Sequence, residues 1–294
     1  MAYSNLGALP FFVAENQGYF AQANIVVVGS HQYNTTGVSN ALLNNQADAG
    51  FTLSYADAFN DEAASPGAIK MFMVGSEVFG YTNNTGIIVM ANSPYNSVAD
   101  LKGKTIGLRP DRIADGISAR WIVSKYFNQS DAKYVAITQV PVLTALAQNQ
   151  VDALYVSQPI INVGAMSNLT RELPNSTCAD IMNPIPQVGA AFTASFVAGN
   201  PDLTGRMVAV VDKAIAYIKA NPQSAIEILA NYTDTPIDEL HIGNDEKTGW
   251  NYYTRANGTI GNASVAGQLQ ALADKYYASG YIGHRINVSD GIYR

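Results

Sequence analysis

Short apolar, β-branched runs alternate with amphipathic helical stretches along nearly the whole chain, and this alternation constrains the fold most strongly. Runs at 25–28, 49–53, 105–108 and 153–156 have the length of buried strands, and helical patterns separate most of them. No repeat or low-complexity block interrupts the order. The pattern predicts an α/β protein whose sheets are parallel and covered by helices on both faces.

The chain is long enough for two cores, because 294 residues exceed the usual size of one domain. Polar or small-residue stretches mark two places where the backbone can pass between lobes, and ligands bind open sheets in the crevice at their strand ends. We therefore expect two lobes with a central cleft between them. Lobe one is expected to comprise 1–91 and 190–294, lobe two 92–189, with hinge crossings near 91–96 and 187–192.

Composition excludes several classes of function. Seventeen Lys and Arg residues against 23 Asp and Glu residues give a net charge of −6, and no basic cluster is present to hold a phosphate backbone, so we expect no nucleic-acid partner. Cys178 is the only cysteine, and the three histidines are far apart, which argues against a disulfide or a metal site. Neither GxxxxGK[ST] nor a strand-bound GxGxxG motif occurs, so we expect no nucleotide cofactor.

Sequence patterns also bear on location. No apolar run approaches the roughly 18 residues of a membrane span. Asn-x-Ser/Thr triplets are about three times as frequent as random placement gives, which suits a secreted surface, although an Asn- and Thr-rich chain also produces them by accident. We expect an extracellular or periplasmic protein, tethered to the outer face of the cell membrane, whose leader is absent from this chain. The triplets start at Asn34, Asn83, Asn128, Asn168, Asn175, Asn231, Asn257, Asn262 and Asn287.

Four stretches, in the same order along the chain, carry a family resemblance. They are LPFFVAENQGYFAQANI from Leu9 to Ile25, ALLNNQADAGF from Ala41 to Phe51, DLKGKTIGL from Asp100 to Leu108 and ALAQNQVDALYVSQP from Ala145 to Pro159. Together they resemble the substrate-binding proteins of nitrate, sulfonate and taurine ABC importers, a superfamily that includes binders of thiamine-precursor pyrimidines. The resemblance implies a type II periplasmic-binding-protein fold, a monomer, and ligand contacts from strand ends and helix N-termini.

The resemblance points to three groups of ligand contacts in lobe one. N–H groups in the first turn of a helix bind oxyanions, and a tyrosine at a cleft edge offers an apolar face and one hydroxyl. Ordinary helix capping and aromatic packing are the structural alternatives for the same residues. The candidates are Ser4, Asn5, Leu6 and Gly7, then Ser54, Tyr55 and Asp57, and finally Phe79 and Tyr81.

In lobe two the candidates are Arg109, Gly116, Ser157 and Gln158. Arg109 follows a strand and can offer its guanidinium to an anion, although a solvated surface arginine is the alternative. Asp115 stands at the start of the next helix, where sulfonate binders usually carry a Gly-Ser-rich turn. A carboxylate there competes with an anionic ligand for the same N–H groups.

The leading hypothesis is a receptor that captures a small organic solute, anionic and sulfonate-like or aromatic, and delivers it to an ABC permease and ATPase. Such a protein needs no catalytic residue, no cofactor and no metal. One alternative is an enzyme on the same fold, acting on a small heterocycle with a carboxylate base. Another is an extracellular ligand-sensing domain, which the sequence of this chain does not separate from a transport receptor. The candidate bases are Asp57, Glu77, Asp111 and Asp115.

Overall fold

A computed structural model describes residues 6–28, 35–78, 85–109, 113–157, 160–234, 236–237, 253–254 and 263–293. The chain divides into two units, which we describe separately. Unit one comprises Met1–Glu77 and Pro186–Arg294, and unit two comprises Val78–Ile185.

Unit one is built on a four-stranded sheet whose order is β1-β8-β2-β9. β1 pairs antiparallel with β8, Ala49 opposite Phe192 and Ser54 opposite Val188, and β2 pairs antiparallel with β9. The strands are β1 (Ala49–Ser54), β2 (Ile69–Val78), β8 (Ile185–Thr193) and β9 (Tyr253–Thr254). The helices are η1 (Leu6–Ala8), α1 (Leu9–Asn16), α2 (Tyr19–Gln22), α3 (Thr35–Leu43), α4 (Tyr55–Ala64), α8 (Ala194–Gly199), α9 (Pro201–Ala220), α10 (Pro222–Thr233), α11 (Ala263–Ala278) and η7 (Val288–Gly291).

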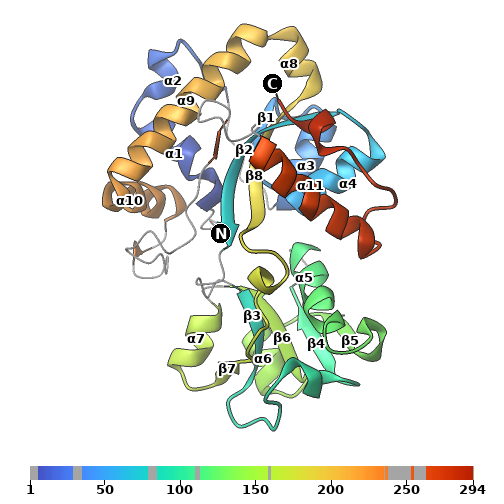
Figure 1. Ribbon diagram of the computed structural model, residues 1–294. Helices are drawn as coiled ribbons and strands as arrows, with labels where there is room; N and C mark the ends of the chain where they lie inside the picture. Colours follow the sequence, from blue (N-terminus) through green and yellow to red (C-terminus); the bar gives the residue numbers. More distant parts are fainter. Residues whose placement is uncertain are drawn as a thin grey trace. The chain divides into compact units, whose positions relative to one another are not determined.

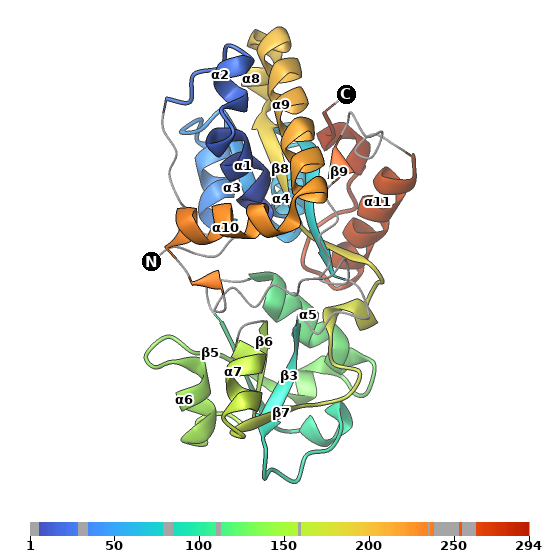
Figure 2. The same ribbon diagram turned by 90° about the vertical axis from the view of Figure 1, so that its left-hand side faces the viewer.

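Helices cover both faces of this sheet (Figure 1). α1 packs on α9 and α10 on one face, seen from the front in Figure 2, and α3, α4 and α11 lie on the other. Phe72 of β2 stacks on Phe192 of β8 with ring centroids 4.1 Å apart, and both side chains are fully buried. These rings belong to an apolar cluster that joins the sheet to α1, α9 and α10. Removal of these side chains from water stabilises the fold of unit one.

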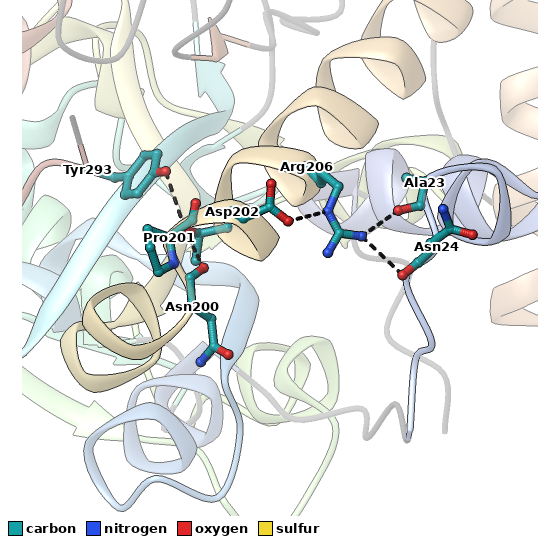
Figure 3. A network of polar contacts seen from close by, with 8 residues as sticks. Ala23, Asn24, Asn200, Pro201, Asp202, Arg206 and Tyr293 are labelled. Atoms are coloured by element: carbon teal, nitrogen blue, oxygen red, sulfur yellow. Dashed lines mark hydrogen bonds and ion pairs between the residues drawn. The ribbon is translucent and has the colours of Figure 1, made fainter.

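The start of α9 gathers distant parts of unit one into a polar network (Figure 3). Arg206 donates to the carbonyl oxygens of Ala23 at 2.6 Å and Asn24 at 3.1 Å, and its Nε lies 2.9 Å from a carboxylate oxygen of Asp202. The arginine therefore satisfies carbonyl groups left open just beyond the end of α2. From the C-terminal segment, Tyr293 donates to the hydroxyl of Thr204 at 3.4 Å.

Unit two is built on a five-stranded mixed sheet whose order is β5-β4-β6-β3-β7. β4 pairs parallel with β5 and β6, while β3 pairs antiparallel with β6 and β7. The strands are β3 (Thr85–Met90), β4 (Thr105–Leu108), β5 (Lys133–Ala136), β6 (Ala153–Ser157) and β7 (Thr170–Glu172). The helices are η2 (Val98–Leu101), α5 (Ile113–Ser124), η3 (Gln129–Asp131), α6 (Val142–Ala147), α7 (Ile160–Met166) and η4 (Cys178–Asp180).

Alternating side chains of β3 and β6 supply two separate cores. Ile87 and Tyr155 face the cluster formed with α5, whereas Ile88 and Leu154 face the cluster formed with α6 and α7. This follows from the two-residue period of a strand, which sends successive side chains to opposite faces. Both faces of the sheet are thus covered, as the apolar runs predicted.

Three expectations from the sequence need correction. The segment 85–90, assigned to lobe one, is β3 of unit two, so the first crossing lies at Glu77/Val78 and not near 91–96; the second lies at Ile185/Pro186, just before 187–192. Neither sheet is purely parallel: β8 returns between β1 and β2 in unit one, and β3 pairs antiparallel with β6 and β7 in unit two. The run 25–28 forms no strand; Val26 and Val28 are 84% and 96% exposed.

Candidate functional site

The N-terminus of α4 directly follows β1 and holds three of the expected site residues. Ser54 is the N-cap, and its hydroxyl accepts a hydrogen bond from the backbone N–H of Ala56 at 3.2 Å. Ser54 is buried, as is Asp57, the third residue of the helix. Ser54 therefore caps α4, and its contact with a ligand stays a prediction.

Asp57 belongs to a pair of carboxylates that join α4 to α3. The hydroxyl of Thr36 donates to Asp57 at 3.5 Å, and the hydroxyl of Ser39 donates to Asp61 at 2.5 Å. Burial, followed by repulsion from Asp61, raises the pKa of Asp57 to about 6, although hydrogen bonds from Thr36 and Ser54 lower it. Burial also raises the pKa of Asp61. At neutral pH these carboxylates carry charge only at a cost.

Tyr55 lies in the core of unit one. Its side chain is 1% exposed, and its hydroxyl donates to the carbonyl oxygen of Met73 at 3.2 Å. Gly189 of β8 makes room for the ring, because a Cβ at this position would lie 2.5 Å from the tyrosine hydroxyl. Tyr55 therefore packs in the core, as the structural alternative expected. Its role as a solute clamp stays a prediction.

A third carboxylate of unit one, that of Glu77 near the end of β2, contacts α11, which lies on the same face of the sheet as α4. One of its oxygens accepts from the amide of Gln268 in α11 at 2.8 Å. Burial, followed by the charges of Asp57 and Asp61, raises the pKa of Tyr281 to about 12. This tyrosine therefore stays protonated and can donate at neutral pH.

In unit two the expected residues lie at the carboxyl ends of two adjacent strands. Arg109 follows β4 and is partly exposed, while Ser157 ends β6, is buried, and stands opposite Thr85 of β3. Because β4 and β6 are parallel neighbours, their carboxyl ends share one edge of the sheet. Gly116, in the first turn of α5, is half buried, and its carbonyl accepts from Arg120 at 3.2 Å. The structure thus brings Arg109 and Ser157 to the same edge.

A buried polar cluster lies in unit two between α5, β3, β6 and η4. Asp115, the third residue of α5, is 3% exposed. Burial raises the pKa of Cys178 to about 11, and burial raises that of Tyr155 well above its usual value; the charge of Asp115 adds to both shifts. Thr85 accepts from the backbone N–H of Cys178 at 3.0 Å. Both the thiol and the phenol are therefore protonated at neutral pH.

Several expected residues lie outside the described parts of the chain, and their roles stay predictions. They are Ser4, Asn5, Phe79, Tyr81 and Gln158, together with the candidate base Asp111. Leu6 and Gly7 fall in η1, where Gly7 is buried. The carbonyl oxygen of Gly7 lies near Gly75 of β2, 3.4 Å from where a Cβ would stand. This places η1 beside the sheet of unit one.

Two features are absent from the residues that the structure describes. No three His, Cys, Asp or Glu side chains in these ranges are arranged to hold a metal ion. Within the same ranges, no helix combines the length and the apolar character that crossing a membrane requires.

Sequence reasoning missed the partners of Asp57. Asp61 was detectable, because aspartates four residues apart share a helix face. Thr36 and Ser39 carried no such signal, since their hydrogen bonds to Asp57 and Asp61 depend on how α3 packs on α4. In unit two, Thr85, Tyr155 and Cys178 come from three separate segments, and no local pattern joins them.

Solved structures show the fold of this protein. The periplasmic aliphatic sulphonate-binding protein SsuA of Escherichia coli superposes with a TM-score of 0.75 over 98% of this chain and 89% of that chain, at 17% identity. DszB, an enzyme crystallised as a variant with biphenyl-2-sulfinic acid, gives a TM-score of 0.69 over 99% of this chain and 94% of that chain, at 15% identity. The chain has the periplasmic-binding-protein fold.

Sequence comparison then identifies the family. The model of the NMT1/THI5-like family matches residues 5–225, about three quarters of the chain. A protein of Brucella abortus (strain 2308), named as a binding protein, is 26% identical over 231 residues, which cover 76% of this chain and 71% of the relative. The chain belongs to the NMT1/THI5-like family, in agreement with the resemblance noted in the sequence.

Proposed function

We propose that this protein is the solute receptor of an ABC importer, outside the cytoplasm, and that it captures a small organic solute with residues of both units. The family match over residues 5–225 is the observation that carries the proposal. The names of the Brucella relative and of SsuA, a binding protein and a sulphonate-binding protein, support it. A permease and an ATPase are the partners that this function requires.

Arg109 and Ser157 are the groups we propose for an anionic part of the solute. They lie at the shared carboxyl edge of β4 and β6, where open sheets bind ligands. A guanidinium offers a planar pair of donors to a sulfonate or a carboxylate, and a hydroxyl adds one more. This edge of unit two therefore accommodates an acid.

The helix N-termini limit which acid is suitable. Asp57 and Asp115 are each the third residue of a helix and are 6% and 3% exposed, so each carboxylate lies at the positive end of its own helix. A small oxyanion that relied on these helix ends would be repelled. The proposed solute consequently carries a ring or a hydrogen-bond donor beside its acidic group.

An enzyme is the second candidate, and the likeness to DszB is the observation that favours it. A cysteine nucleophile would have to be Cys178, the only cysteine of the chain. This residue is fully buried, and its pKa of about 11 leaves little thiolate at neutral pH. Asp57, with a pKa of about 6, is the better-placed base among the described candidates. The receptor remains the proposal.

Thermal unfolding with a solute panel tests the receptor. The panel comprises an alkanesulfonate, an aminoalkanesulfonate, an aromatic sulfonate, an aromatic carboxylate, an aminopyrimidine and nitrate. A solute at 100 times its Kd should stabilise the folded protein by about 2.7 kcal/mol and raise Tm by several degrees. We expect the ring- or amine-bearing acids to act and nitrate to fail.

Two controls make the result decisive. Arg109→Ala should reduce the shift produced by acids to about half or less, whereas Arg285→Ala, at an exposed arginine paired with Asp274, should leave it unchanged. Chromatography of each solute after incubation checks for turnover. No shift with any member of the panel would contradict the receptor, and conversion of a solute that Asp57→Asn abolishes would establish the enzyme.

A further inference from the structure

Five of the nine Asn-x-Ser/Thr triplets fall on described residues, and in all five the asparagine is exposed. They start at Asn128, Asn168, Asn175, Asn231 and Asn287. Such a triplet is an acceptor for N-linked sugars only where both the amide and the hydroxyl two residues later can be reached. The five triplets can therefore be compared by the burial and the hydrogen bonds of their Ser or Thr hydroxyl groups.

In three triplets the hydroxyl is buried or contacts a residue outside the triplet. Thr170 is 5% exposed in β7, and Thr233 is 2% exposed and donates to the carbonyl oxygen of Leu229 at 2.8 Å. Thr177 caps η4 and lies 3.4 Å from the hydroxyl of Thr85. A glycosyltransferase could reach these three hydroxyl groups only if the contacts around them opened.

The other two triplets form turns in which the side-chain oxygen of the asparagine accepts a hydrogen bond from the backbone N–H of the residue two positions later. Asn287 accepts from the N–H of Ser289 at 3.3 Å, but its amide nitrogen also donates to Asp290 at 3.2 Å. Asn128 accepts from the N–H of Ser130 at 3.1 Å and from its hydroxyl at 2.9 Å. Both bonds use Oδ1 of Asn128, so neither occupies its Nδ2, and both residues are exposed.

We propose that Asn128 is a site of N-linked glycosylation. Nδ2 forms a bond to the anomeric carbon of a sugar activated as a lipid pyrophosphate, the bond from that carbon to the pyrophosphate oxygen breaks, the lipid pyrophosphate leaves, and the amide loses one proton to the transferase. No oxidant or reductant is needed. This inference rests on the proposed function only for the location outside the cytoplasm.

The position of Asn128 in unit two is compatible with solute binding. It lies between α5 and β5, just before β5 begins at Lys133, and Lys133 stands opposite Thr105 at the start of the parallel strand β4. Arg109 and Ser157 lie at the carboxyl ends of β4 and β6, the opposite edge of this sheet. A glycan on Asn128 would therefore leave the proposed contacts of unit two uncovered.

The test uses the full chain, secreted with a cleavable leader from a host that performs N-glycosylation. Occupancy of each asparagine is measured by enzymatic deglycosylation in ¹⁸O water and peptide mass spectrometry. We expect Asn128 to be occupied in more than half of the molecules. Ser130→Ala should reduce this occupancy at least tenfold, and Ser130→Thr should retain it.

Asn128→Gln should remove one glycan mass from the intact protein, and the matched variant Asn231→Gln should remove none. An unmodified Asn128 in the folded, secreted protein, or an unchanged glycan mass in Asn128→Gln, would overturn the proposal. The solute panel is measured on the same preparations. A Tm shift with a bare Asn128 contradicts only this inference, and an occupied Asn128 without any shift contradicts only the proposed receptor.

Discussion

Unit one and unit two each place an aspartate as the third residue of a helix that follows a strand, yet the two carboxylates have different neighbours. Asp57 shares its surroundings with a second carboxylate, Asp61, and with the hydroxyl groups of Thr36 and Ser54. Asp115 lies near Tyr155 and Cys178, both neutral at physiological pH because burial raises their pKa values. The aspartate at this helix position therefore titrates near pH 6 in unit one and is embedded among neutral groups in unit two.

The position of a buried aspartate in a helix therefore does not by itself set its pKa. A carboxylate at the first turn is stabilised by the helix dipole in both units. In unit one, burial together with a like charge outweighs that gain, and the pKa rises to about 6. Burial and the like charge of Asp61, on the same helix, decide the outcome, while the hydrogen bond from Thr36 of α3 opposes it.

The largest change in stability is expected when the core of unit one is altered and that of unit two is left intact. Phe72→Ala removes a fully buried ring stacked on Phe192 and should lower the free energy of unfolding by about 3–5 kcal/mol. Hydrogen exchange should show faster opening in β2 and β8 and unchanged protection in β4 and β6. Val26→Ala, at an exposed side chain, should change stability by less than about 0.5 kcal/mol. Equal loss of protection in both units would contradict their separate cores.

The second effect is the pH dependence of unit one. The pKa of folded Asp57, about 6, lies above its ordinary 3.8, so its contribution to stability is complete below about pH 4 and is lost as pH rises through 6. Asp57→Asn should therefore remove up to about 3 kcal/mol of the decline in wild-type stability between pH 4 and pH 7.5, measured by urea denaturation. Asp202→Asn, at the exposed first turn of α9, should keep the wild-type decline. An unchanged profile in Asp57→Asn would show that this carboxylate ionises normally.

The third effect tests the neutral cluster of unit two. A thiol with a pKa of about 11 instead of 9 has about 100-fold less thiolate at pH 8. Alkylation of Cys178 by iodoacetamide at pH 8 should thus be at least 100-fold slower in the folded protein than in 8 M urea. Free cysteine in both buffers corrects for the effect of urea on the reagent. Rapid alkylation of the folded chain would mean that the cluster opens to solvent.

The smallest effect concerns the solute. Arg109→Ala should weaken the binding of an acidic solute at least tenfold, about 1.4 kcal/mol, without lowering Tm in the absence of solute. Titration calorimetry with the solute that gives the largest thermal shift measures the change. Asp57→Asn should act in the opposite direction, by removing a negative charge. Weaker binding in both variants would show that unit one also contributes an essential acceptor.

Much of the secondary structure followed from local pattern. The strands 49–54, 105–108 and 153–157 were predictable because β-branched and apolar runs of this length favour buried strands, and α9 because its apolar residues recur with helical period. The run 25–28 has the same composition but forms no strand, because pairing depends on a neighbour that the run does not specify.

Local pattern also located Asp57, Asp115, Arg109 and Ser157 at helix starts and strand ends. It did not show that β3 pairs with β6, that β8 returns between β1 and β2, or that the ring of Tyr55 points into the core against Gly189. Strand order and side-chain burial depend on contacts between segments far apart in the chain. For the same reason, the sequence showed where the carboxylates are, but packing in the folded chain set the pKa of Asp57 and buried Cys178.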